Sequence, residues 1–143
     1  MVTDGCGVPC FVLSLASMAT CWANLGEAAA SHSTPLGRIG RAMQAAPEFV
    51  SGDDRLDLAL ARATRKPMVT KIGAQGLFCG ALLEPQVGFA IKVLTGVSEA
   101  RPIAAWHILE RWFPGILPRE AIAPWETLLN LAGKPVGTRE YRW

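Results

Sequence analysis

The sequence predicts an α+β fold, an antiparallel sheet flanked by helices, and three features point to it. Up to residue 64, apolar residues recur with the helical spacing of three or four positions. From residue 68 to 94 the pattern changes to short extended runs separated by Gly and Pro. After Pro102 the helical spacing returns. With 143 residues, half of them hydrophobic, we expect one domain over residues 1–143.

The first predicted helix begins at Pro9, directly after the turn that holds Cys6, because proline suits the first position of a helix. No charged residue occurs from Gly5 to Gly26, so we expect this helix to be buried on nearly all sides. Its main apolar stripe is formed by Phe11, Leu15, Met18, Trp22 and Leu25.

Two further helices are expected before the sheet. Thr34 can cap the first of them, with Pro35 at its first position and Pro47 beyond its end. Its apolar face is predicted to consist of Leu36, Ile39 and Met43. Either Asp53 or Asp54 can cap the second, which runs to Thr64 and places Leu56 and Leu60 one turn apart.

The extended runs predict three antiparallel strands, at residues 68–72, 77–83 and 87–94. Residues 84–86 supply a hairpin turn between the last two, while Gly73 and Gly76 allow a bulge or a close backbone approach. A helix from Pro102 is expected to pack on the sheet through Trp106, Leu109, Trp112 and Phe113. A helix around residues 121–131 and a last strand at 136–143 follow.

Composition excludes several classes of protein. A net charge of +2 with 18% charged residues is unlike a disordered chain or a basic nucleic-acid binder. Residues 5–26 are long enough to cross a bilayer, but they contain polar residues and lack a basic flank, so we expect neither a membrane span nor a signal peptide. Four cysteines, three of them within 16 residues of one another, are unlike a disulfide framework and predict reduced thiols in a cytoplasmic protein. The mean hydropathy of +0.25 indicates either a membrane segment or a surface that something else covers.

The sequence offers few residues that are candidates for catalysis or metal binding. Cys6 lies between two glycines at the expected helix start, which favours an exposed thiolate. The negative charge of Asp4, two residues away, opposes the thiolate. The other interpretation is a buried structural Cys. Cys10 follows four residues later, but no His lies at zinc-ligand spacing from the pair. We expect His32 and His107 to be surface or packing residues. No Ser is followed three residues later by Lys, so the sequence holds no Ser-x-x-Lys nucleophile pair.

Several short motifs, in order, resemble the L-asparaginase II family of bacteria and fungi, typified by the rhizobial inducible enzyme. The segments that match are Asp4-Gly5-Cys6-Gly7-Val8-Pro9, Pro47-Glu48-Phe49-Val50-Ser51-Gly52 with Arg55, Lys71-Ile72-Gly73-Ala74-Gln75-Gly76, Gly88 to Lys92, and Asn130 to Gly137. The resemblance implies a fold like that of glutaminases and serine β-lactamases. It also implies hydrolysis of L-asparagine to L-aspartate and ammonia.

The resemblance implies site residues as well. Cys6 matches a zinc ligand of the family and Asp4 the acidic residue beside it, while Lys71 and Gly73 match residues that line the cleft. Family members are more than twice as long, and their first half carries the Ser-x-x-Lys pair and a Cys-x-x-Lys segment that helps to hold the zinc. We therefore expect the C-terminal half of such a protein, with an incomplete zinc site, that needs a separate N-terminal half for activity and that can also form a homo-oligomer.

Two other functions remain open from the residues. The chain can be a non-catalytic remnant or an interaction module, with an exposed sheet edge and tryptophans as its contacts. The candidate contacts are Trp106, Trp112, Trp125 and Trp143. A small membrane protein is the third alternative.

Overall fold

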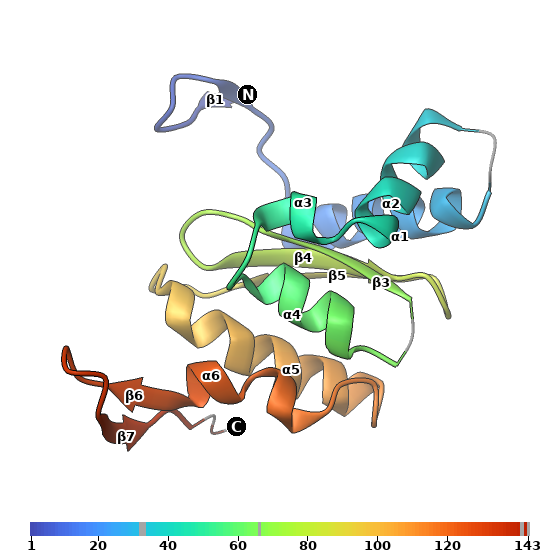
Figure 1. Ribbon diagram of the computed structural model, residues 1–143. Coiled ribbons are helices and arrows are strands. Elements are labelled where there is room, and N and C mark those ends of the chain that lie inside the picture. The colour runs from blue at the N-terminus through green and yellow to red at the C-terminus, as the bar shows by residue number, and fades with distance from the viewer. Residues whose placement is uncertain (32–33, 66, 141, 143) are drawn as a thin grey trace.

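A three-stranded antiparallel sheet lies at the centre of the computed structural model, which describes residues 1–31, 34–65, 67–140 and 142 (Figure 1). Its strands are β3 (Met68–Ile72), β4 (Leu77–Leu82) and β5 (Val87–Lys92), in the order β3-β4-β5. The three predicted strands and their hairpin turn are confirmed, with the second and third ending one and two residues early. The α+β class is confirmed.

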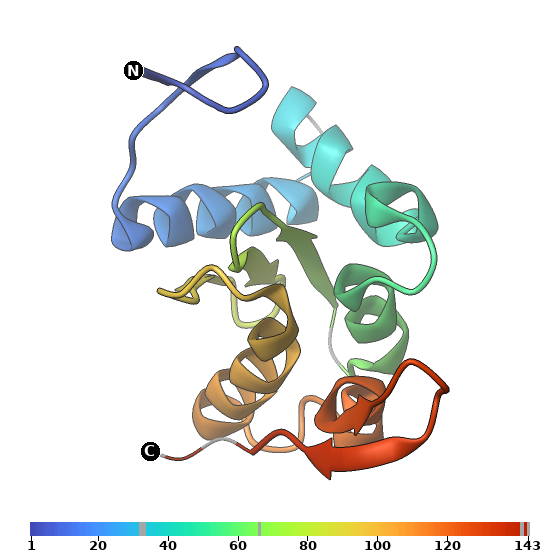
Figure 2. The same ribbon diagram turned by 90° about the vertical axis from the view of Figure 1, so that its left-hand side faces the viewer.

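Helices cover both faces of this sheet (Figures 1 and 2). On one face α1 (Leu15–Ala30) and α2 (Pro35–Ala45) pack over Val69 and Ala81. On the other face, α4 (Leu56–Ala63) and α5 (Arg101–Trp112) enclose a larger core around Phe78 and Leu82. Because side chains alternate along a strand, β3 and β4 each contribute to both cores, while Ile91 of β5 lies in the larger one.

The first helix begins at Leu15 rather than at Pro9. Ser14 caps it by accepting a hydrogen bond from the Ser17 N–H, which satisfies one of the free donors of the first turn. Pro9 lies instead in β2 (Pro9–Cys10), which pairs with β1 (Val2–Thr3) in a hairpin. The prediction of all-round burial is also wrong, since α1 buries only the face of Leu25, Gly26 and Ala29.

The cap predicted for α2 is confirmed, since the Thr34 hydroxyl accepts from the Gly37 N–H and the helix ends before Pro47. Its predicted face is mostly wrong. Leu36 and Ile39 are exposed, whereas Gly37 and Gly40 are buried and Met43 packs on the core. A Cβ on Gly37 would lie 2.2 Å from the Ala28 carbonyl oxygen, so α1 and α2 approach each other through residues without side chains.

The short helix α3 (Glu48–Ser51) precedes α4. Leu56 and Leu60 of α4 are buried in the core, as predicted. The expected aspartate cap is absent: Arg55 holds the N-cap position without a side-chain bond, because the chain turns at Asp54 with a φ of 56°.

α5 follows the 3₁₀ turn η1 (Ser98–Ala100), has Pro102 in its first turn and packs on the sheet as predicted. Leu109 is in the core and Trp106 and Phe113 pack against it, but Trp112 is exposed. The predicted 121–131 helix is wrong. The chain forms η2 (Arg119–Ala121) and one helical turn, α6 (Ala123–Glu126), before β6 (Thr127–Leu129) pairs with β7 (Pro135–Thr138). The last strand is thus shorter than expected.

Within the ranges described above, no helix has both the length and the apolar character needed to cross a membrane.

Candidate functional site

A buried carboxylate organises the end of β3. Asp57, in the first turn of α4, is 2% exposed. Its carboxylate accepts hydrogen bonds from the Ser51 hydroxyl at 2.5 Å, the Thr70 hydroxyl at 2.9 Å and the Ile72 backbone N–H at 3.1 Å. Three donors from α3 and β3 compensate the burial of this acid. Asp57 therefore ties three elements of the chain together at one point.

Lys71 joins this network from the exposed face of β3. Its ammonium donates to the Ser51 hydroxyl at 3.0 Å and to the Ile72 carbonyl at 3.0 Å. Ser51 thus accepts from the lysine and donates to the buried carboxylate of Asp57. We call these three residues, Asp57, Ser51 and Lys71, the lysine cluster.

Lys71 stands at the edge of a cavity of about 490 Å³. The other walls come from α2 and α3 and are apolar: Ala42, Met43, Ala46, Phe49 and Val50. Phe49 is 87% exposed, so this cavity has an open apolar rim. A positioned ammonium beside an apolar cavity can bind a carboxylate or stabilise negative charge that develops on a carbonyl oxygen.

Gly73, the second cleft residue that the resemblance implied, shapes the turn after Lys71. Its N–H donates to the Leu77 carbonyl at 2.8 Å, and a Cβ on Gly73 would lie 2.9 Å from the Leu77 side chain. The buried Arg101 donates to the carbonyl of Gly73 at 2.9 Å. The residue thus fixes the backbone at the end of the strand that carries Lys71.

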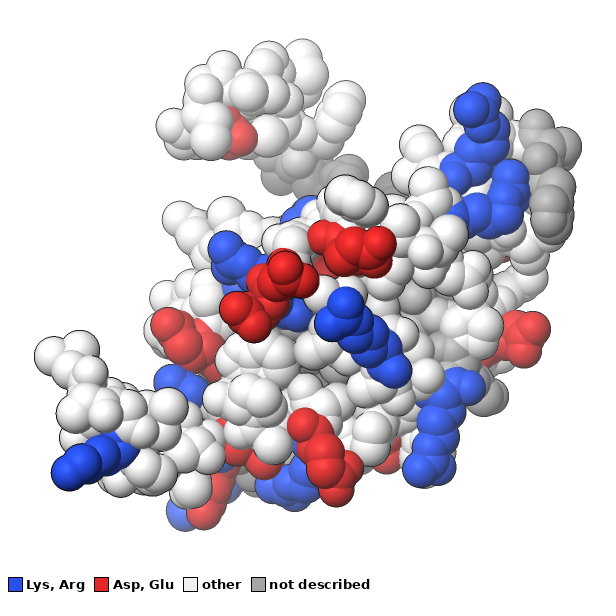
Figure 3. All heavy atoms as spheres, in the orientation of Figure 1, with Lys and Arg blue, Asp and Glu red and all other residues white. Residues whose placement is uncertain are grey.

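The two N-terminal candidates, Asp4 and Cys6, lie in the β1–β2 hairpin, which stands apart from the sheet (Figures 1 and 2). The Asp4 carboxylate accepts from the N–H groups of Val8 and Cys6, and these bonds lower its pKa. Cys6 is exposed in the hairpin turn and not at a helix start, which corrects the expected environment of its thiol. In Figure 3 this hairpin is white apart from one acidic residue, whereas acidic and basic groups adjoin one another over α3 and α4.

These hairpin residues do not by themselves fit a zinc ion. Tetrahedral zinc needs four ligands, usually thiolates and imidazoles. In the part of the chain that the structure describes, no group of three or more His, Cys, Asp or Glu side chains converges on one point. The pKa of Cys10 is raised by its partial burial and by the charge of Asp4, which works against a metal-binding thiolate there.

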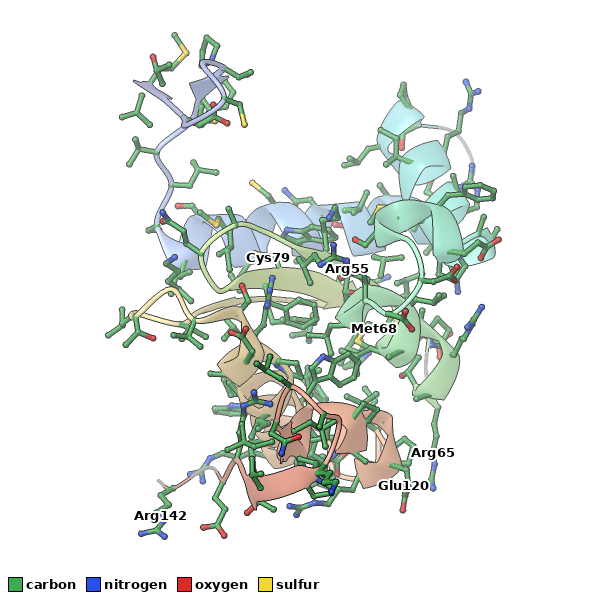
Figure 4. All side chains as sticks on the ribbon, turned by 60° about the vertical axis from the view of Figure 1, so that its left-hand side comes forward. Arg55, Arg65, Met68, Cys79, Glu120 and Arg142 are labelled. Atoms are coloured by element: carbon green, nitrogen blue, oxygen red, sulfur yellow. The ribbon has the colours of Figure 1, made fainter. Side chains whose placement is uncertain are left out.

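The remaining sequence candidates have packing roles or lie elsewhere. His107 packs edge-on against Trp106 at 5.0 Å between ring centroids, and burial lowers its pKa, as expected for a packing histidine. His32 and Trp143 lie outside the described residues. Cys79 is buried in β4 (Figure 4), and burial raises its pKa.

Sequence reasoning missed Ser51, Asp57 and Arg101 as partners of Lys71 and Gly73. One signal was available for Asp57: it is the only acidic residue within the apolar run from Leu56 to Ala61. A single charge at a core position of a helix indicates a buried network. No local pattern identifies Ser51, because its partners come from two other elements.

These features define an α+β protein with a positioned lysine at the rim of an apolar cavity. The family model for L-asparaginase II matches residues 1–140, nearly the whole sequence, and the chain belongs to that family. No curated protein matches the sequence.

Proposed function

We propose that this chain forms the lysine-bearing wall of a site that hydrolyses L-asparagine to L-aspartate and ammonia. The observation that carries the proposal is the lysine cluster, in which Ser51 holds the Lys71 ammonium at the rim of the apolar cavity. Membership of the L-asparaginase II family supports the choice of substrate.

The proposed role of Lys71 is electrostatic. Cleavage of an amide passes through a state in which negative charge gathers on the carbonyl oxygen, and a fixed cation close to that oxygen lowers its energy. Ser51 positions the ammonium and is itself anchored on Asp57, so the cation does not have to be reoriented during the reaction. Asp57 and Ser51 are positioning residues in this scheme.

A separate polypeptide segment supplies the nucleophile in this proposal. Amide hydrolysis through a covalent intermediate needs a nucleophile within hydrogen-bond reach of a base, and this sequence has no Ser-x-x-Lys pair. Phe49 at the rim of the cavity is exposed, as is Phe11, 77% exposed between the β1–β2 hairpin and α1, and these residues support a surface that such a segment covers. In the same proposal, the missing zinc ligands come from that segment.

The test is ammonia release from L-asparagine by the purified chain, alone and mixed with a first-half fragment of a family member that carries Ser-x-x-Lys. We expect no release by the chain alone and release by the mixture. Ammonia release by the chain alone would refute the need for a second segment.

A non-catalytic interaction module is the second candidate, favoured by the same exposed residues. It predicts that the first-half fragment binds the chain, seen as co-elution in size-exclusion chromatography, while the mixture releases no ammonia. The two candidates are therefore separated by one pair of measurements.

A further inference from the structure

A second cavity, of about 190 Å³, lies between the start of α4 and the start of α5. Neither Ser51 nor Lys71 lines it. Its walls include two basic residues, two acidic residues and an indole: Arg55, Arg101, Asp54, Glu99 and Trp125. Arg55, at the N-terminal end of α4, is labelled in Figure 4.

Arg101, a largely buried residue with 8% exposure, lines this cavity. Its Nη1 donates to the carbonyls of Gly73 at 2.9 Å and Leu77 at 3.1 Å. A guanidinium has five N–H donors, so those on Nε and Nη2 remain. Among the described residues no hydrogen bond is made by Nε or Nη2, and no fully buried side-chain nitrogen is without a partner, so these donors are accessible, and Arg101 lines the cavity.

The charge of Arg101 lacks a direct counter-ion. The ion pairs among the described residues are Arg119–Glu126 and Arg142–Glu140, so neither Arg101 nor Arg55 is paired within that part of the chain. A buried cation without a contacting anion is unfavourable. Burial lowers the pKa of Arg101, because the charged guanidinium is less stable away from water. The negative charges of Asp57 and Glu99 raise this pKa, and the positive charge of Arg55 lowers it further.

The rim of the cavity carries the opposite charge. Glu99 and Asp54 are both exposed and both line it, so a ligand that places an anion on the arginines meets carboxylates on the other side. A simple anion would be repelled by these acids, whereas a molecule with one positive and one negative group satisfies both sides.

We infer that this cavity binds a free α-amino acid with a short side chain, its carboxylate on Arg101 and Arg55 and its ammonium towards Glu99 and Asp54. The volume supports a small ligand, because 190 Å³ is the space of about six water molecules at roughly 30 Å³ each. Trp125 provides an apolar wall for the side chain. This site is separate from the lysine cluster and does not depend on the proposed activity.

The experiment is an NMR titration of the purified ¹⁵N-labelled chain with L-alanine, propionate and n-propylamine, followed at the Trp125 indole N–H. We expect L-alanine to shift this signal in a saturable way. Propionate lacks the ammonium and propylamine lacks the carboxylate, so each should bind about tenfold more weakly or worse. Absence of a saturable shift with L-alanine up to roughly 100 mM, or equal binding of propionate, would overturn the inference.

Variants locate the site without disturbing Arg101, which also holds the β3–β4 turn. Both Arg55→Gln and Glu99→Gln should weaken L-alanine binding about tenfold, since each removes one charge from the cavity. Arg38→Gln, an exposed arginine on α2, is the matched control and should bind like the unchanged chain. Lys71→Ala should also leave binding unchanged, which separates this test from that of the proposed function. Equal binding by Arg55→Gln and the control would contradict the assignment.

Discussion

Replacing Asp57 with alanine should be among the most destabilising single changes in the chain. The carboxylate is fully enclosed and accepts three hydrogen bonds, from Ser51, Thr70 and the Ile72 backbone. Asp57→Ala removes the acceptor for all three donors at once. It leaves the buried Thr70 hydroxyl and the backbone N–H of Ile72 without this partner, and it frees Ser51 from the position in which it holds Lys71.

The magnitude follows from these contacts. A hydrogen bond to a charged group contributes roughly 1.5–3 kcal/mol, but the three bonds share one carboxylate, and its desolvation cost disappears with it. A buried donor left without an acceptor costs roughly 1–3 kcal/mol, and Asp57→Ala leaves two of them, the Thr70 hydroxyl and the Ile72 N–H. We therefore expect Asp57→Ala to lower the free energy of unfolding by about 4 kcal/mol.

Equilibrium unfolding in urea, followed by circular dichroism, measures this loss. Thr70→Val is the matched control, because it removes one of the three donors at similar volume and should cost about 1 kcal/mol. A loss for Asp57→Ala of less than about 1 kcal/mol, or a loss no larger than that of Thr70→Val, would refute the proposed organisation of the site.

Three further predictions concern packing and titration. Gly88→Ala should lower the free energy of unfolding in urea by about 3 kcal/mol, because a Cβ there would lie 1.9 Å from a carbonyl oxygen of α1. Gly137→Ala is the control and should cost far less, because its Cβ would have room. Equal losses for the two variants would contradict the close approach of Gly88 to α1. The Cys79 thiol, buried and with a raised pKa, should resist iodoacetamide at neutral pH until urea unfolds the chain, and fast alkylation of the folded chain would count against its burial. Burial and then the charge of Arg119 lower the pKa of His107, so its contribution to stability is present above the ordinary pKa of 6.5 and is lost as the pH falls below that value. Arg119→Gln should raise the NMR titration midpoint of this imidazole, and an unchanged midpoint would exclude the charge effect.

The sheet could be predicted from the sequence because its signals are local. The alternating residues of β5, the apolar run of β4 and the Glu84-Pro85-Gln86 turn between them define this hairpin without reference to the rest of the chain. The helix α2 was located for the same reason, since Thr34 and Pro35 mark its start.

The errors arise where tertiary contacts decide the structure. The packed face of α2 is made by Gly37 and Gly40. Because glycine has no side chain, this close approach of α2 to α1 gives no hydrophobic pattern from which the packed face could be predicted. The start of α1 was placed too early because Pro9 fits both a helix start and an edge strand, and only pairing with Thr3 selects the strand.

The candidate site was predicted in part. Lys71 was identified through its strand and its motif, and the structure places it at a cavity rim. Its partners Ser51 and Asp57 lie 20 and 14 positions earlier in the sequence, and only the folding of α3 and α4 against β3 brings them together. The lone acid in an apolar helix marks Asp57 as part of a buried network, but no local pattern identifies Ser51 or its contact with Lys71.

The central claim is that the lysine cluster belongs to an amide-cleaving site. The kcat for L-asparagine, measured with the chain mixed with a first-half fragment of a family member, tests this claim most directly. We predict that Lys71→Ala lowers kcat at least about a hundredfold, that Ser51→Ala lowers it less, and that Lys134→Ala, at an exposed lysine of the β6–β7 turn, leaves it unchanged. Unchanged kcat in the Lys71→Ala mixture would contradict the account.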